Sequence, residues 1–318
     1  MKLVTYEDIR KLNIAPGDCY QWVSEMIADK KSVDLPAKIS MKPFDGVFCN
    51  VMPCIISNSV LGRIGGVKIV TRYPERIPSL DSKLLLFDAD SGEFLALMDA
   101  NWITAMRTGA VAAHSIMLFG KKNFSEIGML GLGNTARAAL LVLTDVIADR
   151  EVKIKLLKYK GQEEAFAQRF SGYQNLQFTY VEDSGKLVRG SEVIISAATY
   201  FEQDICSDDC FDEGILVVPI HTRGFSNCDL FFDKVYADDY SHVKHFKNFS
   251  KFRSFAEVSD VVAGNAVGRE NNKERILAYN IGVSMHDINF AAHIYQLLKD
   301  ESGMIDIDMK EPVNKFWI

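Results

Sequence analysis

A glycine-rich turn near the middle of the chain constrains its fold more than any other feature. The apolar run 127–130 is followed at once by a Gly-x-Gly-x-x-Ala pattern, made of Gly131, Leu132, Gly133, Asn134, Thr135 and Ala136. A helix-forming segment comes next. In this order, the first glycine makes a tight turn, the second lets backbone N–H groups approach a pyrophosphate, and the helix N-terminus supplies partial positive charge. The pattern therefore predicts dinucleotide binding, with a plain strand–turn–helix corner as the alternative.

The segments after Phe124 alternate between strand and helix patterns. Apolar residues in the segment 134–148 recur at helical spacing, as they do on the buried face of a helix. The expected strands are 126–130, 153–157, 176–181, 193–197, 215–220 and, last, 234–237. Strands that alternate with helices in this way form a parallel sheet covered on both faces. We therefore expect an α/β fold with a Rossmann-type doubly wound parallel sheet.

The first part of the chain has a different pattern, in which short β-type runs are separated by turn residues. Strands are expected at 65–72, 83–88 and 94–98, followed by a helix over 104–118. We predict an α+β domain for substrate binding or assembly at 1–118 and the dinucleotide-binding domain at 119–287. A C-terminal helical segment, 288–318, is expected to pack on the first domain. Asp287 stands three residues after Ser284, so a capping box explains it without any chemistry.

Composition narrows the class of protein. The 318 residues are 48% hydrophobic and 25% charged, and the net charge of −6 argues against nucleic acid or an anionic membrane surface as a partner. The N-terminus has no apolar signal core, and no apolar run is long enough to span a bilayer. Six scattered cysteines form neither a disulfide framework nor a metal-ligand pattern. We expect a reduced, cytoplasmic protein without a metal.

The choice between NAD(H) and NADP(H) depends on the end of the second predicted strand. An NAD-binding fold usually has an acidic residue there to bind the ribose hydroxyls. Here the strand runs into Lys158 and Lys160, and Glu151 precedes it at the wrong end. The two lysines could neutralise a 2′-phosphate, or they could form a solvated basic loop. NADP(H) is therefore favoured over NAD(H).

Several blocks of the sequence together resemble the ornithine cyclodeaminase/μ-crystallin family over residues 35–295. Ahead of the glycine turn the blocks are Leu35-Pro-Ala-Lys38, Asn50-Val-Met-Pro53, Gly66-Val-Lys68-Ile-Val, Leu86-Phe-Asp88 and Thr104-Ala-Met-Arg107-Thr-Gly-Ala. After it come Ile195-Ser-Ala-Ala-Thr199 and Tyr279-Asn-Ile-Gly282-Val-Ser-Met-His-Asp287. The most specific sign is that the Lys68 and Arg107 blocks precede the nucleotide turn.

The resemblance implies hydride transfer between the nicotinamide and the Cα of an amino or imino acid. Such an enzyme must hold an α-carboxylate, and Arg107 suits bidentate carboxylate binding. Lys68, and Lys38 where family members more often carry Arg, would complete a cationic clamp. Lys68 could also orient the substrate nitrogen or donate a proton to it. The alternatives are a helix-surface cation for Arg107, an edge-strand cation for Lys68 and a surface lysine for Lys38.

Other positions are placed by the same resemblance. Ala198 and Thr199 would border the cofactor at the carboxyl end of a strand, unless they form a plain turn. Gly282 would also be a cofactor-binding residue. The resemblance further implies a homodimer built through the sheet of the first domain.

One departure from the family bears on the substrate. Family members that cyclise ornithine carry an Asp after the strand expected at 215–220, whereas this chain has His221 and Arg223 and no carboxylate until Asp229. This resembles more closely, though only in part, the branch that oxidises N-(carboxyalkyl) amino acids in siderophore-precursor synthesis. We hypothesise that Arg223 binds a second carboxylate and that His221 is an acid/base group. A loop arginine and a structural histidine are the alternative.

The sequence leaves three functions open. The leading one is an NAD(P)-dependent oxidoreductase acting at the Cα–N bond of an amino or imino acid. The second is a non-catalytic, NADP(H)-dependent small-molecule binding protein of μ-crystallin type. The third is a true ornithine cyclodeaminase.

Overall fold

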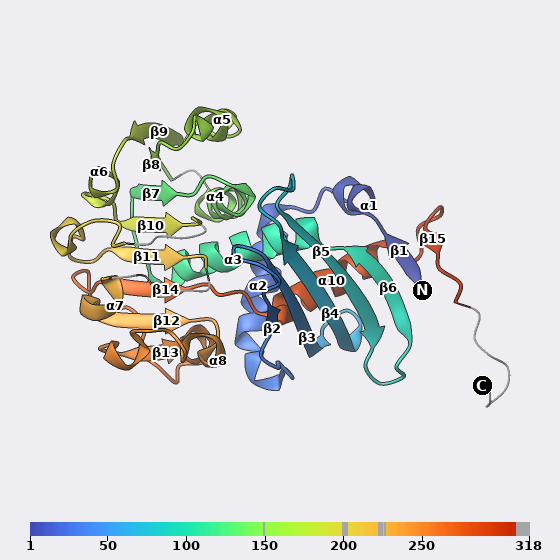
Figure 1. The fold of residues 1–318 in the computed structure, drawn as a ribbon. Helices are drawn as coiled ribbons and strands as arrows, with labels where there is room; N and C mark the ends of the chain where they lie inside the picture. The colour runs from blue at the N-terminus through green and yellow to red at the C-terminus, as the bar shows by residue number, and fades with distance from the viewer. Residues whose placement is uncertain (149, 199–202, 222–224, 226, 310–318) are drawn as a thin grey trace. The chain divides into compact units, whose positions relative to one another are not determined.

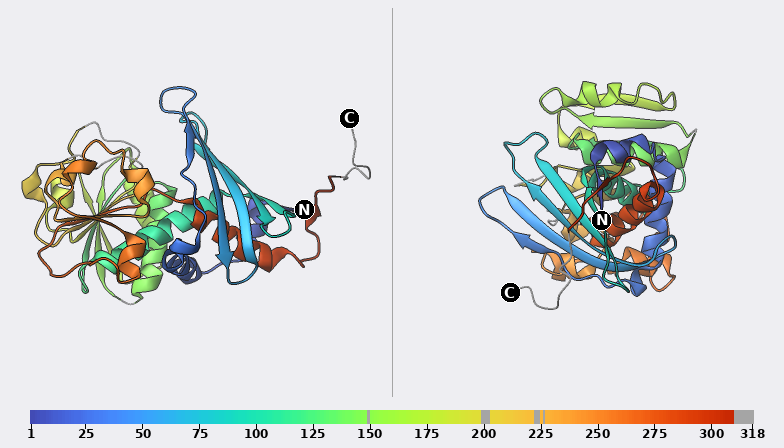
Figure 2. Two further views of the ribbon diagram at one scale, coloured as in Figure 1. Left: turned by 90° about the horizontal axis from the view of Figure 1, so that it is seen from below. Right: turned by 90° about the vertical axis from the view of Figure 1, so that its right-hand side faces the viewer.

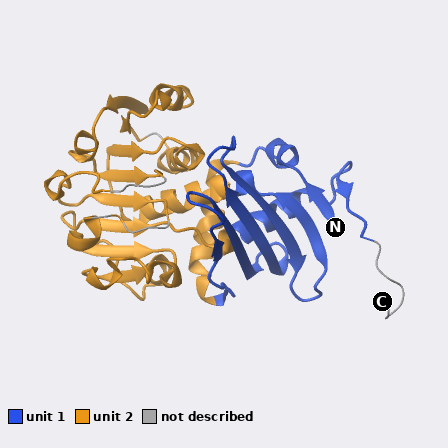
Figure 3. Cartoon of the chain, in the orientation of Figure 1, with its two compact units in different colours: residues 1–14, 32–103, 287–318 blue, residues 15–31, 104–286 orange. Residues whose placement is uncertain are grey.

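The computed structural model describes residues 1–309 apart from 149, 199–202, 222–224 and 226 (Figure 1). The chain divides into two compact units (Figure 3). Unit 1 comprises residues 1–14, 32–103 and 287–318, and unit 2 comprises 15–31 and 104–286. Among the described residues, no helix is long and apolar enough to cross a membrane.

This division differs from the expected domains 1–118 and 119–287, because two helices belong with the second sheet. Most of α3 (Asn101–Phe119) packs closely on α4 (Asn134–Ile147): a Cβ added at Gly109 would lie 2.4 Å from the backbone carbon of Ala138. Helix α2 (Pro16–Ala28) joins the same unit, where Gly17 lies against the side chain of Asp145 in α4. The boundary therefore falls inside α3 rather than after it.

Unit 1 contains a seven-stranded sheet in the order β15-β1-β6-β5-β4-β3-β2. Strands β2 to β6 pair antiparallel, β1 pairs parallel with β6, and β15 pairs antiparallel with β1. The strands are β1 (Lys2–Val4), β2 (Ile39–Met41), β3 (Phe48–Asn58), β4 (Gly62–Arg72), β5 (Leu80–Asp88), β6 (Phe94–Asp99) and β15 (Ile305–Asp306). Helix α1 (Tyr6–Lys11) and most of α10 (Ser284–Leu298) complete the unit.

The two faces of this sheet differ. On one face α10 packs so closely that a Cβ added at Gly66 would lie 2.5 Å from the Cδ1 atom of Ile288. On the other face an apolar row, formed by residues directly opposite one another on β3, β4, β5 and β6, is only partly buried. The row consists of Pro53, Val67, Leu85 and Leu97.

Unit 2 is built on an eight-stranded sheet in which every pair is parallel, in the order β13-β12-β14-β11-β10-β7-β8-β9. The strands are β7 (Glu126–Leu130), β8 (Val152–Leu157), β9 (Leu176–Val181), β10 (Val193–Ser196), β11 (Leu216–Pro219), β12 (Lys234–Ala237), β13 (Phe255–Glu257) and β14 (Ile276–Tyr279). The chain runs outward from β7 to β9 and then returns to β10 on the other side of β7. This reversal between β7 and β10 is where ligands bind in doubly wound folds.

Helices lie on both faces of this sheet (Figure 2). Besides α2, α3 and α4, unit 2 has only short helical segments among its described residues, and the first of these, η1, extends one residue beyond the unit. They are η1 (Lys30–Ser32), α5 (Gln162–Gln168), α6 (Ser184–Val188), η2 (Asp208–Cys210), α7 (Cys228–Phe231), α8 (Tyr240–Val243), η3 (Phe249–Lys251) and α9 (Val258–Val262).

The expected fold class is confirmed, with one correction to its strands. All six expected strands of the parallel sheet are present with small shifts of their ends. The expectation that 234–237 is the last strand was wrong, because β13 and β14 follow it, and β14 inserts between β11 and β12. β14 is only four residues long and entirely buried, and a run this short shows no periodicity.

Candidate functional site

Gly131 lies at the point where the parallel sheet reverses its strand order. It follows β7 with a backbone φ of +79°, a conformation that side chains rarely permit. A Cβ added there would lie 2.4 Å from the backbone nitrogen of Ala198, which follows β10. Both the conformation and the close approach require glycine. Gly131 and Ala198, two of the predicted cofactor-binding residues, therefore meet at the carboxyl ends of neighbouring strands.

Gly133 leaves the N-terminus of α4 open. It is the N-cap of this 14-residue helix, and no side chain caps the helix there. A Cβ added at Gly133 would meet no atom within 4 Å, and both Gly133 and Asn134 are exposed. Open space before the first N–H groups of a helix is what a bound phosphate needs. The turn 131–136 thus fits a dinucleotide pyrophosphate.

Lys158 and Lys160 are exposed and follow β8, as the sequence predicts. The Nζ atom of Lys158 lies 3.2 Å from Oε1 of Glu182, and that of Lys160 lies 5.1 Å from the centre of the Tyr159 ring. An exposed ion pair of this kind contributes little to stability, so Lys158 can exchange Glu182 for a phosphate at small cost. Glu151 precedes β8 and is therefore at the opposite end of the strand.

Arg107 is buried within unit 2, with 6% of its surface exposed, which excludes the alternative of a helix-surface cation. Its guanidinium group packs on the backbone of Gly282, which follows β14. The backbone N–H of Gly282 donates a hydrogen bond of 2.8 Å to Oδ2 of Asp238, which follows β12. Gly282, predicted as a cofactor ligand, therefore contacts the predicted carboxylate-binding arginine. The guanidinium group lies at the carboxyl edge of the sheet, the same edge that carries the glycine turn.

Lys68 is fully buried in unit 1, on a central strand rather than an edge strand. In β4 it stands directly between Met52 and Leu84 of the neighbouring strands, and both of these are buried. Its Nζ atom donates a hydrogen bond of 2.7 Å to Oδ1 of Asp287, whose side chain is also fully buried. The structure thus pairs a predicted site residue with a carboxylate that the sequence had assigned to helix capping. Lys38, before β2, is partly buried.

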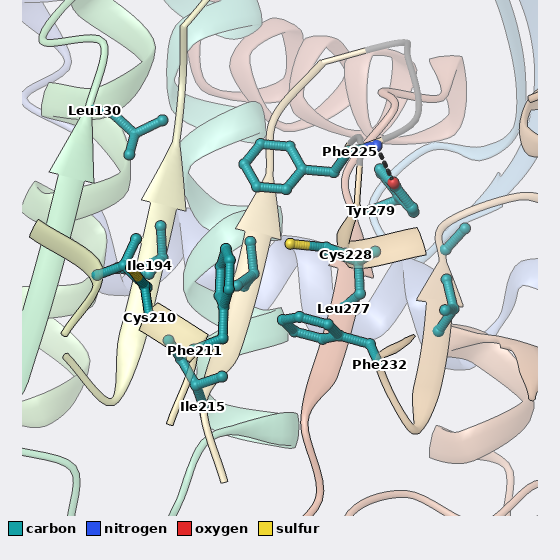
Figure 4. Close-up of a cluster of buried hydrophobic side chains, with 14 of the residues drawn as sticks. Leu130, Ile194, Cys210, Phe211, Ile215, Phe225, Cys228, Phe232, Leu277 and Tyr279 are labelled. Atoms are coloured by element: carbon teal, nitrogen blue, oxygen red, sulfur yellow. Dashed lines mark hydrogen bonds between the residues drawn. The ribbon is translucent and has the colours of Figure 1, made fainter. Parts of the chain in front are cut away.

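The loop after β11 has a buried anchor (Figure 4). The hydroxyl group of Tyr279 accepts a hydrogen bond of 2.5 Å from the backbone N–H of Phe225 and donates one to Oδ1 of Asp229. Asp229 and Tyr279 are buried, and burial raises the pKa of both groups. Asp229 therefore holds the loop through its bonds to Tyr279 and Phe225.

His221, the predicted acid/base group, is partly buried beside this anchor, and its ring stacks on that of Phe225 with 5.6 Å between centroids. Arg223 and Thr199 lie outside the described residues. Within the part of the chain that the structure describes, no group of histidine, cysteine and acidic side chains could hold a metal ion.

Sequence reasoning missed two acidic residues next to the predicted cations. Asp238 holds Gly282 against Arg107, and Asp287 binds Lys68. The only available signal for Asp238 was its position directly after a strand. For Asp287 the signal was its place in the block that carries the family resemblance.

The parallel sheet and its glycine turn define a dinucleotide-binding α/β protein. The sequence model of the ornithine cyclodeaminase/mu-crystallin family matches residues 2–302. The chain belongs to this family, as the sequence blocks had indicated.

Two curated relatives and one solved structure illustrate the range of similar proteins. Nodulation efficiency protein NfeD of Rhizobium meliloti is 25% identical over 82% of this chain and 83% of its own length. N-((2S)-2-amino-2-carboxyethyl)-L-glutamate dehydrogenase of Staphylococcus aureus is 27% identical over 69% of this chain and 68% of its own. The structure of Thermococcus litoralis Δ1-pyrroline-2-carboxylate reductase with NADH and L-proline has a TM-score of 0.85. It is 22% identical and covers 96% of this chain and 100% of its own.

Proposed function

We propose that this protein is an NAD(P)-dependent oxidoreductase acting at the Cα–N bond of an amino or imino acid. One observation carries the proposal: a buried guanidinium group, Arg107, lies at the same edge of the parallel sheet as the open glycine turn. A nicotinamide dinucleotide bound along this edge supplies or accepts the hydride. The relatives support the reaction class, since they include a dehydrogenase of an N-substituted amino acid and a reductase of a cyclic imino acid.

The protein's own residues would bind and orient the substrate. Arg107 holds the α-carboxylate through two parallel N–H···O bonds, because its guanidinium group is fixed on the Gly282 backbone. Lys68 acts on the substrate nitrogen, and Lys38 adds positive charge for the carboxylate. His221 exchanges a proton, and Arg223 binds a second carboxylate in a dicarboxylic substrate. The S. aureus relative, whose substrate is an N-carboxyalkyl glutamate, supports this last assignment.

The cofactor preference follows from the end of β8. Lys158 and Lys160 offer two exposed cations, and Glu163, which follows the strand, accepts a hydrogen bond from the Tyr159 N–H instead of facing solvent, which favours the 2′-phosphate of NADP(H). NAD(H) is the alternative, and the T. litoralis structure contains NADH. We therefore propose that the protein binds both dinucleotides and prefers NADP(H).

A homodimer is proposed through the partly buried apolar row on the sheet of unit 1. The row runs across four strands, and Ile69 next to it on the same face is 44% exposed. A contiguous apolar surface of this kind is typical of an interface between subunits. The expected cytoplasmic location stays a prediction.

The function is tested by following the absorbance of NADPH and NADH with a panel of imines, and that of the oxidised forms with a panel of amino acids. The panel includes Δ1-pyrroline-2-carboxylate, L-ornithine and N-carboxyalkyl amino acids, with Arg107→Ala as the site variant. Turnover that Arg107→Ala abolishes supports the proposal. Tight binding of dinucleotide and a carboxylate ligand without any turnover supports the binding-protein alternative instead.

A further inference from the structure

The Lys68–Asp287 pair is fully buried, and both cross-strand neighbours of Lys68 are apolar. Lys68 stands in a cross-strand row between Met52, which is 4% exposed, and Leu84, which is fully buried. Removing an ammonium group and a carboxylate from water costs several kcal/mol for each ion. Apolar residues of similar volume usually replace such a pair with no loss of stability. Stability alone therefore does not explain this pair.

Asp287 lies in the first turn of α10, which begins at Ser284, and it also contacts a distant strand. Its Oδ1 atom accepts a hydrogen bond from Lys68, 219 residues away in the sequence. A negative charge in the first turn of a helix is stabilised by the helix dipole. The Asp287 side chain also points toward the ammonium group of Lys68, which it binds.

We propose that Asp287 is a positioning residue for Lys68, which it holds by Nζ and keeps protonated for proton transfer to the substrate nitrogen. The inference rests on the proposed function and adds a residue to it. In the direction of reduction, the imine carbon gains a hydride from a reduced nicotinamide dinucleotide and its nitrogen gains a proton from Lys68 Nζ. The C=N π bond breaks, new C–H and N–H bonds form, and solvent returns a proton to the neutral lysine.

The physical consequence is a coupling between the Asp287 charge and the protonation of Lys68. An adjacent carboxylate favours the charged form of an amine, whereas apolar surroundings favour the neutral form. Without the carboxylate, Lys68 would lose its proton at a pH lower by about one unit or more. Imine reduction needs this proton. Without the carboxylate, its rate would therefore begin to decline at a lower pH than in the wild-type protein.

The experiment compares Asp287→Asn with wild-type protein by two measurements. In protein labelled with ¹⁵N-lysine, the Nζ signal of Lys68 is followed against pH, with Lys68→Met used to assign it. In the assay, kcat and KM for imine reduction are measured over the same range. We expect the Nζ midpoint and the alkaline limb of kcat to move down together by about one pH unit, with kcat reduced about 10²-fold and KM little changed.

Two further variants separate positioning from structure. Asn289 lies on the same helix as Asp287, and its side chain accepts a hydrogen bond of 2.6 Å from Asn58. Asn289→Ala breaks this bond without removing a charge near Lys68. It should lower stability but leave the Nζ midpoint and the pH profile unchanged. The double variant Lys68→Met, Asp287→Leu replaces the pair with apolar side chains and should fold with undiminished stability while losing turnover. If Asp287→Asn does not fold, Asp287→Glu should restore the wild-type Nζ midpoint.

The outcomes distinguish a failure of this inference from a failure of the proposed function on which it rests. An unchanged Nζ midpoint in Asp287→Asn, with turnover intact, overturns the inference alone. A double variant as unstable as Asp287→Asn also overturns it, since the pair would then be structural. A shifted midpoint in a protein that reduces no imine overturns the proposed function alone.

Discussion

The guanidinium group of Arg107 rests on the backbone of Gly282, so closely that a Cβ added to Gly282 would lie 2.7 Å from Nη1. Gly282 has a backbone φ of +85°, and its N–H is held by Asp238 at 2.8 Å. The Gly282 backbone therefore limits the positions open to the guanidinium group. This contact joins the end of β14 to the helix that precedes the glycine turn.

Replacing Gly282 with alanine should displace the guanidinium group. We expect kcat/KM for the carboxylate substrate to decrease about 10²-fold, the usual result of a displacement near 1 Å in a site. Because Gly282 is also a predicted cofactor residue, nucleotide affinity should decrease as well, but by a smaller factor. Steady-state kinetics and nucleotide titration measure the two effects. The control is Gly264→Ala, which has a similar φ of +73° but no atom within 4 Å of an added Cβ.

Gly131→Ala should abolish nucleotide binding, because a Cβ there would collide with the backbone of Ala198. A ligand that binds only the folded protein at a hundredfold over its Kd stabilises it by about 2.7 kcal/mol. Thermal unfolding with NADPH should show this stabilisation in wild type and in Gly264→Ala, but not in Gly131→Ala. An equal shift in all three proteins would mean that the turn is only a corner of the fold.

Tyr279→Phe should weaken the loop that carries His221. The change removes the bonds from Tyr279 to Asp229 and to the Phe225 N–H. The Phe225 N–H keeps a bond of 3.3 Å to Asp229, and Asp229 keeps one of 3.3 Å from Asn248, so neither group loses every partner. The loss of two hydrogen bonds should lower the free energy of unfolding in urea by about 1–3 kcal/mol. Tyr240→Phe, at an exposed position, is the matched control and should change stability by less than about 0.5 kcal/mol.

Because of His114, the free energy of unfolding should decrease as the pH falls into weak acid. Burial lowers its pKa from 6.5 to about 4, so the unfolded chain binds a proton that the folded protein excludes. Its contribution is complete above pH 6.5 and is lost as the pH falls toward 4, by about 3 kcal/mol in total.

His114→Phe should therefore make unfolding free energies less dependent on pH between these values. His245→Asn, at an exposed position, should leave the dependence as it is in wild type. Identical pH dependence in wild type and His114→Phe would contradict the assignment.

Ile69→Glu should separate the proposed dimer without unfolding the protein. Ile69 is exposed on the sheet of unit 1 and stands opposite Lys83, which can accept the new charge as a cross-strand pair. Light scattering should show a dimer in wild type and a monomer in the variant. Tyr180→Glu, at a comparably exposed position in unit 2, should remain dimeric. A monomeric wild-type protein would refute the interface.

The sequence was sufficient for the fold class because its signals are local. Strands such as β7 and β9 are short runs bounded by turns, and the glycine turn occupies consecutive residues. β14 escaped prediction because four buried residues have neither period nor length to mark them. The compact units could not be read from the sequence either, since the close approach of Gly109 to α4 is a tertiary contact.

The sequence singles out the cations of the candidate site but not the residues that they contact. Lys68 and Arg107 stood out through their sequence blocks, whereas Asp287 and Asp238 act on residues far away in the chain. The contact of Lys68 with Asp287 spans 219 residues and follows no local rule. The resemblance predicts Gly282 as a cofactor residue, and the structure shows that its backbone also supports Arg107.

The central claim is that the protein transfers hydride at an amino acid Cα. It is tested most directly by incubating the protein with an imine and NADPH that carries deuterium at the transferable position. Mass spectrometry of the amino acid product then locates the label. The account predicts one deuterium at Cα in the product of wild-type protein and no labelled product with Arg107→Ala. Tight binding of NADPH with no deuterium in any product across the imine panel would contradict it.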